Sequence, residues 1–184
     1  MALGFLASAA VLVLVSRFTI ASPYWQLGVE FALIGFSLGY VMTPVTEAIM
    51  GSIPKAKAGI GSAMNSVFRT FSGAIGVGLL GAVAGGIYKS DFMKAGSVAG
   101  LPQELALRAS DSIGTAIKIA DSGQLSAVMS DALARFARES FMDGWSAMAV
   151  VSAVLFFIGS ILVIKFMPSL AQAEKTGVQV EEGR

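Results

Sequence analysis

The sequence predicts an all-α integral membrane protein with four transmembrane helices and a polar, partly helical insert before the last of them. The composition is the first reason, since the chain is 55% hydrophobic and only 14% charged. The second is a set of apolar segments, each close to or above the ~20 helical residues that cross ~30 Å of hydrocarbon. They cover residues 2–20, 24–51, 58–88 and 145–167. Helices are expected because a spanning segment must satisfy its own backbone hydrogen bonds in lipid.

The composition also excludes several classes of function. The net charge is +1 and the basic residues are scattered, which argues against nucleic acid as a partner. The chain has no cysteine and no histidine, so thiolate chemistry and the commonest metal ligand and general base are missing. We therefore expect no enzyme activity, no cofactor and no metal site, and the lipid bilayer as the main surrounding.

Prolines and polar runs divide the chain into four predicted parts. Residues 1–88 form a three-helix membrane unit, interrupted by Pro23 and Pro54. Residues 89–144 form an extracytoplasmic insert, a surface excursion with two short amphipathic helices, one over 103–120 and one from Leu125 to Phe141. Residues 145–168 form the last transmembrane helix, and residues 169–184 a disordered cytoplasmic tail.

The amino-terminal apolar run admits two interpretations. It could be a secretory signal, but it lacks a positively charged start and exceeds the usual apolar length of ~7–15 residues. The favoured interpretation is a membrane helix with which the chain begins abruptly, as in the carboxy-terminal piece of a longer protein.

Glycines recur in the second and third segments. The run from Gly76 to Gly81 matches the G-x-G-x-x-G dinucleotide pattern, but that pattern needs a preceding strand, and here it lies within an apolar helix. Small residues four apart instead let membrane helices approach closely. We predict helix packing at Gly35, Gly39, Gly73, Gly76, Gly81 and Gly85.

Arg69 is an unusual residue for an apolar helix. At helical rise its backbone lies about 9 Å inside the hydrocarbon layer. A polar and small stripe shares its helical face, and this stripe predicts that Arg69 is a buried charge facing protein or water. The stripe comprises Ser62, Asn65, Ser66, Ser72, Gly73 and Gly76. The alternative is a guanidinium that reaches back to the headgroups.

The second segment supplies two carboxylates. Glu30 and Glu47 each lie about 8–9 Å from an end of that helix, and Glu47 is at the same membrane side as Arg69. Pro44 removes a backbone donor, as in the interrupted helices of transport pathways. Glu30, Glu47, Thr43 and Thr46 are therefore candidates for proton coupling or for lining a cavity. For both glutamates a rim position at the membrane surface is the alternative.

One stretch resembles a known family. The run GFSLGYVMTPVTEAIMGSIPKAKAGIGSAMNSVFRTFSGAIGVG, residues 35–78, is similar to the late part of fourteen-helix drug:proton antiporters of the major facilitator superfamily, the EmrB/QacA type. The shared pattern is a glycine-rich helix with a late proline, a short Pro-basic-Ala-Gly loop and then Gly-Ser-Ala-x-Asn-x-x-x-Arg. The residues that carry the last part are Gly61, Ser62, Ala63, Asn65, Arg69, Gly73 and Gly76.

The resemblance implies a fragment of a major facilitator fold, the last four of fourteen helices, in the cell inner (plasma) membrane as a multi-pass protein. The loop at 52–57 and the tail would be cytoplasmic and the insert outside. The implied function is proton-coupled export of hydrophobic or cationic compounds, hence multidrug efflux and drug resistance. Its partners would be the substrate, protons and the missing amino-terminal helices. A free-standing four-helix membrane interaction or assembly subunit is the alternative.

Overall fold

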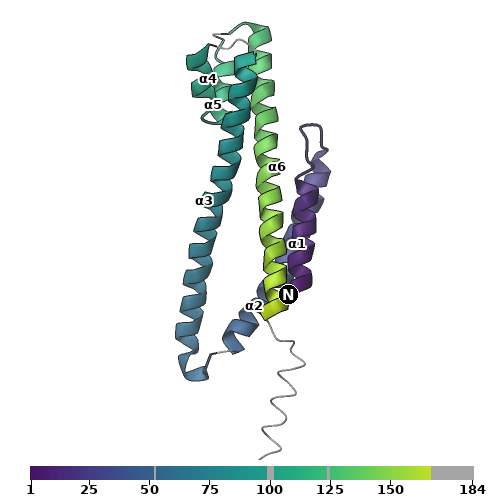
Figure 1. Ribbon diagram of the computed structural model, residues 1–184, viewed down its shortest axis with the longest axis vertical. Helices are drawn as coiled ribbons and strands as arrows, with labels where there is room; N and C mark the ends of the chain where they lie inside the picture. Colours follow the sequence, from purple (N-terminus) through teal and green to yellow (C-terminus); the bar gives the residue numbers. More distant parts are fainter. Residues whose placement is uncertain (52, 99–101, 124, 167–184) are drawn as a thin grey trace, which may run out of the picture.

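The computed structural model describes residues 1–51, 53–98, 102–123 and 125–166, and these residues form helices joined by turns (Figure 1). The predicted disordered tail, residues 169–184, lies outside the described residues. The helices are α1 (Ala2–Val15), α2 (Tyr24–Gly51), the short 3₁₀ helix η1 (Lys55–Lys57), α3 (Ala58–Val98), α4 (Gln103–Ala109), α5 (Ile113–Ala120) and α6 (Ala127–Phe166).

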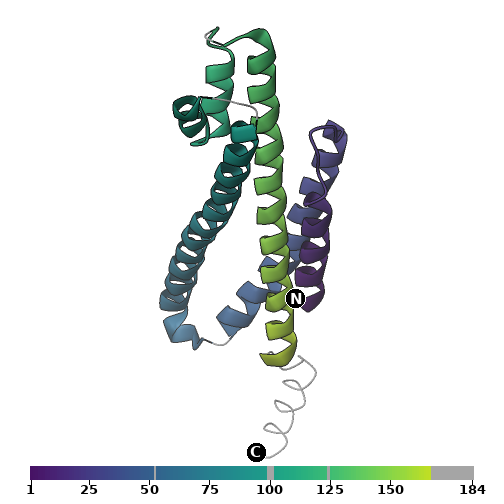
Figure 2. The same cartoon turned by 45° about the horizontal axis from the view of Figure 1, so that its top comes forward.

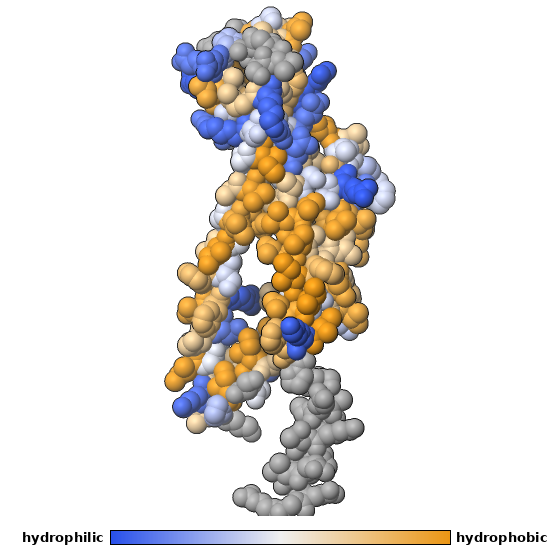
Figure 3. Space-filling model, in the orientation of Figure 1, coloured by the Kyte–Doolittle hydropathy of each residue, from blue (hydrophilic) through white to orange (hydrophobic). Residues whose placement is uncertain are grey.

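The long helix α6 organises the molecule. It packs extensively against both α1 and α3, and α1 in turn packs on α2. Contacts between α2 and α3 are few. Helices α3 and α6 lie side by side near the start of α6 and diverge toward the opposite end, where the space-filling view shows an opening between them (Figures 2 and 3). Most of α3 therefore has no covering neighbour within the described residues.

The first helix is shorter than the predicted span. It ends at Val15 rather than Ile20, and its 14 residues measure about 21 Å, less than the ~30 Å of hydrocarbon. After Val15 the hydroxyl of Ser16 donates to the carbonyl of Val13, and the N–H groups of Arg17 and Phe18 donate to the carbonyls three residues earlier. Within the part of the chain that the structure describes, three helices, α2, α3 and α6, are long and apolar enough to cross a membrane. The structure therefore does not confirm the predicted count of four spans.

The second helix has the predicted bounds. Pro23 ends the preceding turn, and its carbonyl accepts from the N–H of Gln26 as α2 begins. The helix continues through Pro44, whose missing N–H removes one internal hydrogen bond. Beyond this region α2 tilts toward the start of α3 (Figure 2).

Helices α3 and α6 are longer than the sequence predicts. Helix α3 continues ten residues past Tyr88, and α6 begins at Ala127 instead of Trp145. The second amphipathic helix of the insert and the last transmembrane helix are thus one continuous helix. No proline interrupts residues 125–145, and Gly144 stays helical because it packs against α3. Each of the two helices has about 40 residues, about 60 Å, twice the hydrocarbon thickness.

The insert forms a packed cap with its own core. We define the cap as residues 88–98, 102–123 and 125–141. The predicted helix over 103–120 is broken at Ser110, whose hydroxyl donates to the carbonyl of Leu107, and Ser112 then caps α5 by accepting from the N–H of Thr115. The buried members of its core are Tyr88, Phe92, Ala106, Ala109, Ala116, Ala120, Leu133 and Ala137.

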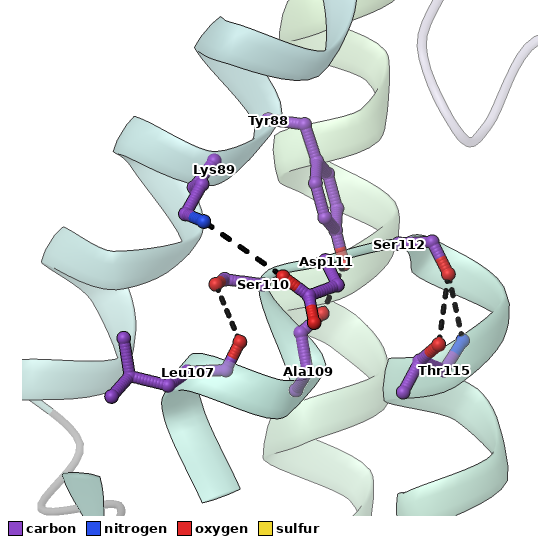
Figure 4. A network of polar contacts seen from close by, with 8 residues as sticks. All are labelled: Tyr88, Lys89, Leu107, Ala109, Ser110, Asp111, Ser112 and Thr115. Atoms are coloured by element: carbon purple, nitrogen blue, oxygen red, sulfur yellow. Dashed lines mark hydrogen bonds and ion pairs between the residues drawn. The ribbon is translucent and has the colours of Figure 1, made fainter. Parts of the chain in front are cut away.

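Polar contacts join α3 to the insert at the base of this core (Figure 4). The hydroxyl of Tyr88 donates to the carbonyl of Ala109 at 3.0 Å. Lys89 lies 3.8 Å from the carboxylate of Asp111, an exposed ion pair that contributes little to stability. The outer surface of the cap is polar, whereas the helices below it present mostly apolar side chains (Figure 3). This contrast agrees with a cap in water above a membrane-embedded part.

A second core lies between α1, α2 and α6. Its buried residues are Val11, Val15, Phe18 and Ala149, with Leu27, Ile34, Met142 and Trp145 packed around them. Two hydrogen bonds fasten α6 to α1: the hydroxyl of Ser146 donates to the carbonyl of Ser16, and that of Ser160 to the carbonyl of Ala2. These two bonds fix the position of α6 along the axis of α1.

Candidate functional site

A cavity of about 170 Å³ lies inside this bundle of α1, α2 and α6, and Glu30 is on its wall. Apart from Glu30 and Ser152, the cavity is lined by apolar side chains. They are Leu12, Val15, Phe18, Leu27, Phe31, Ile34, Trp145, Met148 and Ala149. No residue of α3 takes part. The cavity is thus separate from the face that α2 turns toward α3.

The helical period places Glu30 in this wall. Leu27, Glu30, Phe31 and Ile34 follow one another at spacings of three and four, which puts them on one face of α2. That face meets α1, whose span Ala2–Val15 carries no charged side chain. The result is a carboxyl group whose residue is only 6% exposed.

The carboxyl oxygen Oε2 of Glu30 is buried and has no hydrogen-bond partner among the described residues. The other polar wall residue, Ser152, donates its hydroxyl to the carbonyl of Met148 in its own helix. No ion pair within the described part of the chain involves Glu30. An ionised carboxylate buried without a partner costs several kcal/mol, at least about 3. Glu30 is thus a buried carboxyl group without an ion-pair partner among the described residues.

The other candidates on α2 lie toward its opposite end. The hydroxyls of Thr43 and Thr46 donate to the carbonyls of Gly39 and Met42, one turn earlier. Thr43 also lines an open hollow of about 710 Å³ together with Phe36, Tyr40 and Pro44. Thr46 and Glu47 are exposed. The structure thus separates Glu30 from the group formed by Thr43, Thr46 and Glu47.

Arg69 and most of its polar stripe are exposed. Ser62, Ser66 and Arg69 face away from the other described helices, and Asn65 is half-buried in a hollow between the end of α2 and the start of α3. No ion pair joins Arg69 to Glu47 in the described ranges. The described residues do not shield Arg69, and its burial stays a prediction.

The glycines that were expected to pack have no close neighbour among the described residues, and their packing stays a prediction. A Cβ atom at Gly35, Gly39, Gly73, Gly76, Gly81 or Gly85 would meet nothing within 4 Å. The close approaches occur at other glycines. A Cβ at Gly144 would lie 2.6 Å from the carbonyl oxygen of Ala84, and one at Gly4 would lie 2.7 Å from Val41. A Cβ at Gly159 would lie 3.1 Å from the ring of Phe5.

A signal for some of these contacts was present in the sequence. Gly4 and Ser8, and Ser140 and Gly144, are also pairs of small residues four apart, and all four residues are buried. No pattern in the sequence predicted that the aromatic residues Phe18, Phe31 and Trp145 would line one cavity with Glu30. These aromatic residues come from α2, α6 and the turn after α1, and only the packing of α6 beside α1 brings them together.

Comparison with known proteins gives three informative relatives. The chain is 28% identical over 134 residues to the multidrug efflux pump LfrA of Mycolicibacterium smegmatis, which covers 73% of this chain and 26% of LfrA. It is 27% identical over 158 residues to the methyl viologen resistance protein SmvA of Salmonella typhimurium, covering 84% of this chain and 30% of SmvA. A triacylglyceride transporter of Mycolicibacterium smegmatis is 30% identical over 136 residues, 74% of this chain and 21% of the transporter.

The chain spans less than a third of the length of these curated relatives. No family model matches the chain. No solved structure matches it either. The relatives are named as efflux and transport proteins, and α2, α3 and α6 are long and apolar enough for membrane spans. The similarities and the helices together support a relationship between this chain and a family of membrane transporters.

Proposed function

We propose that the chain is the carboxy-terminal segment of a proton-coupled exporter of the major facilitator superfamily, of the EmrB/QacA type, in the inner membrane. The observation that carries the proposal is the similarity to the multidrug efflux pump LfrA and the methyl viologen resistance protein SmvA, which covers 73–84% of this chain but only 26–30% of theirs. The proposed substrates are hydrophobic or cationic compounds, and the coupling ion is the proton. The printed name of SmvA, a methyl viologen resistance protein, agrees with a cationic substrate.

The uncovered length of α3 supports the same proposal. Within its apolar span, α3 presents large side chains such as Val67, Phe68 and Val77, each at least 60% exposed. It also carries Arg69 on an exposed polar stripe. An intramembrane arginine that faces lipid costs about 2.5–3.5 kcal/mol on insertion scales, so a protein partner is favoured. The amino-terminal helices of the complete exporter would cover this face and supply an anion for Arg69.

Export by the complete transporter tests the role of Arg69. Arg69→Ala is expected to lower proton-driven export at least about tenfold, because it would leave a buried anion unpaired. Arg69→Lys should restore export only in part, since an ammonium lacks the planar fork of a guanidinium. Lys89→Ala is the matched control: Lys89 is an exposed cation of the same helix, and its loss should leave export unchanged. Wild-type export by Arg69→Ala would show that Arg69 only reaches to the headgroups.

Glu47 provides a second arm of that experiment. Because no ion pair joins the two residues in the described structure, the losses caused by Glu47→Ala and Arg69→Ala should combine independently in the double variant. A double variant no worse than the worse single variant would instead indicate direct pairing in the transporter.

Cysteine labelling tests the proposed topology, because the chain has no native cysteine. Ala56 in η1 and Lys118 in α5 are both exposed and lie at opposite ends of α3. In intact cells that carry the complete transporter, a membrane-impermeant maleimide should label Lys118→Cys and not Ala56→Cys. Opening the cells should make Ala56→Cys reactive. The reverse pattern in intact cells would place the cap in the cytoplasm and contradict the proposal.

A further inference from the structure

We propose that a hollow between helix α6 and the turn after α1 binds the headgroup of a phospholipid that carries a phosphate and a primary ammonium group, as phosphatidylethanolamine does. The hollow has a volume of about 470 Å³, and its charged lining residues are Arg17 of the turn and Glu139 and Asp143 of α6. We call it the Arg17 hollow. No described residue of α3 lines it, so it lies apart from the face that the amino-terminal helices would cover. The inference therefore stands or falls independently of the proposed function.

The Arg17 hollow lies where the apolar part of the molecule meets the cap. The turn between α1 and α2 stands beside α6, just below the cap (Figure 1). Tyr24 and Trp25, which follow this turn, are exposed, and Trp145 comes two residues after Asp143 on α6. Tyrosine and tryptophan are enriched at the headgroup level of membrane proteins. At this level the ligand is expected to be a lipid headgroup.

The charged side chains of the Arg17 hollow do not neutralise one another by direct contact. No ion pair in the described ranges joins Arg17 to Glu139 or to Asp143. Two hydroxyl groups of the same wall, those of Ser16 and Ser146, each donate to a backbone carbonyl. The guanidinium therefore has N–H donors to offer a ligand, and the two carboxylates have acceptor oxygens.

The order of these charges across the membrane surface matches the proposed headgroup. The hydroxyl of Ser146 donates to the carbonyl of Ser16, which places Arg17 near the level of Ser146. At helical rise, Asp143 lies about 4.5 Å and Glu139 about 10 Å farther toward the cap than Ser146. In a glycerophospholipid the phosphate is attached to the glycerol, and the ammonium lies beyond it. The guanidinium would thus meet the phosphate, and the carboxylates the ammonium.

Hydrogen bonding favours ethanolamine over other common headgroups. A primary ammonium has several N–H donors, and carboxylates accept from them in short, charge-assisted bonds. The quaternary ammonium of phosphatidylcholine has no N–H donor. Phosphatidylglycerol has no cation, so its phosphate would lie beside two carboxylates without compensation. The volume is sufficient, because a cavity of about 150 Å³ already holds one benzene molecule.

Native mass spectrometry of the purified 184-residue chain tests the proposal. The chain is released from detergent micelles that contain equimolar phosphatidylethanolamine, phosphatidylcholine and phosphatidylglycerol with the same acyl chains. The phosphatidylethanolamine adduct should exceed each of the other adducts at least about tenfold, because only this lipid satisfies both charges of the hollow. Glycerophosphoethanolamine, which has the headgroup without acyl chains, should not displace the lipid at equal concentration. Its displacement of the lipid would assign the hollow to a soluble zwitterion and overturn the proposal.

Variants separate the two charges of the Arg17 hollow. Arg17→Gln should lower the phosphatidylethanolamine adduct at least about tenfold. Arg17→Lys should retain part of it, since an ammonium still binds phosphate as a point charge. The double variant Glu139→Gln/Asp143→Asn should bind phosphatidylethanolamine and phosphatidylcholine equally, because the acceptors that distinguish the two headgroups are gone. All these side chains are exposed, so the variants are expected to fold.

Arg135→Gln and Asp131→Asn are the matched controls. Both residues are exposed charges of α6 that do not line the Arg17 hollow, and their substitution should leave the adduct ratios unchanged. Equal adducts of phosphatidylethanolamine and phosphatidylcholine in the parent chain overturn the proposal. A preference for phosphatidylethanolamine that survives in the Glu139→Gln/Asp143→Asn variant, or an unchanged adduct in Arg17→Gln, also overturns it.

Discussion

Phe92→Ala is expected to lower the free energy of unfolding of the cap by about 3–5 kcal/mol. Phe92 is 0% exposed and stacks on Tyr88 with ring centroids 5.7 Å apart. Its loss would leave a cavity among α3, α4 and α6 that the alanine-rich faces of the short helices cannot fill. The effect should be large because α4 and α5, with seven and eight residues, are too short to be stable without this core.

Amide hydrogen exchange on the chain in detergent micelles measures this loss locally. Amides of α4 and α5 should exchange much faster in Phe92→Ala, whereas those of α1 and the second half of α6 should keep their protection. Phe92→Leu should give a smaller effect, and Val128→Ala, at a position that is 82% exposed, should give none. Unchanged exchange in α4 and α5 would mean that the insert folds without this core.

Gly144→Val is expected to destabilise the chain by about 1–3 kcal/mol or more by forcing α3 and α6 apart. A Cβ at Gly144 would lie 2.6 Å from the carbonyl oxygen of Ala84 and 3.3 Å from its carbonyl carbon. These are backbone atoms, so a change of side-chain rotamer cannot relieve the clash. Because α3 contacts α6 at Ala84 and Gly144, the two helices would have to move apart or shift along each other.

Gly81→Val is the matched control for this prediction. Gly81 lies on α3, three residues from Ala84, and a Cβ there would meet nothing within 4 Å. Its substitution should change stability by less than about 0.5 kcal/mol. Thermal unfolding of both variants in the same detergent compares them. Equal losses in the two variants would contradict the close approach of α3 and α6 at Gly144.

Helix α2 could be predicted with its bounds, because Pro23 and the proline-containing turn after Gly51 are local stop signals. The extents of α3 and α6 could not. Residues 89–98 and 127–144 are polar enough to leave a membrane, and hydropathy indicates where a span ends but not where a helix ends. They continue as helix because they bury Phe92, Leu133 and Ala137 against each other and against the insert.

The candidate site was predicted only in part. The sequence identifies Glu30 as a carboxylate in an apolar helix, and the structure buries it, whereas Glu47 and Arg69 are exposed among the described residues; the roles of all three stay predictions. Small-residue spacing pointed to six glycines, none of which has a close neighbour in the described ranges. Spacing indicates which residues share a helical face but not which face meets a partner.

The sequence by itself determined the helical class, the apolar spans of α2, α3 and α6, and the likeness to efflux proteins, because these follow from local composition and order. Only the tertiary structure decided that the insert is a cap with its own core, that Gly144 is a close contact, and that Glu30 faces a cavity between α1 and α6. Each of these depends on contacts between helices that are not consecutive in the chain. Contacts of that kind arise from packing, and no local pattern encodes them.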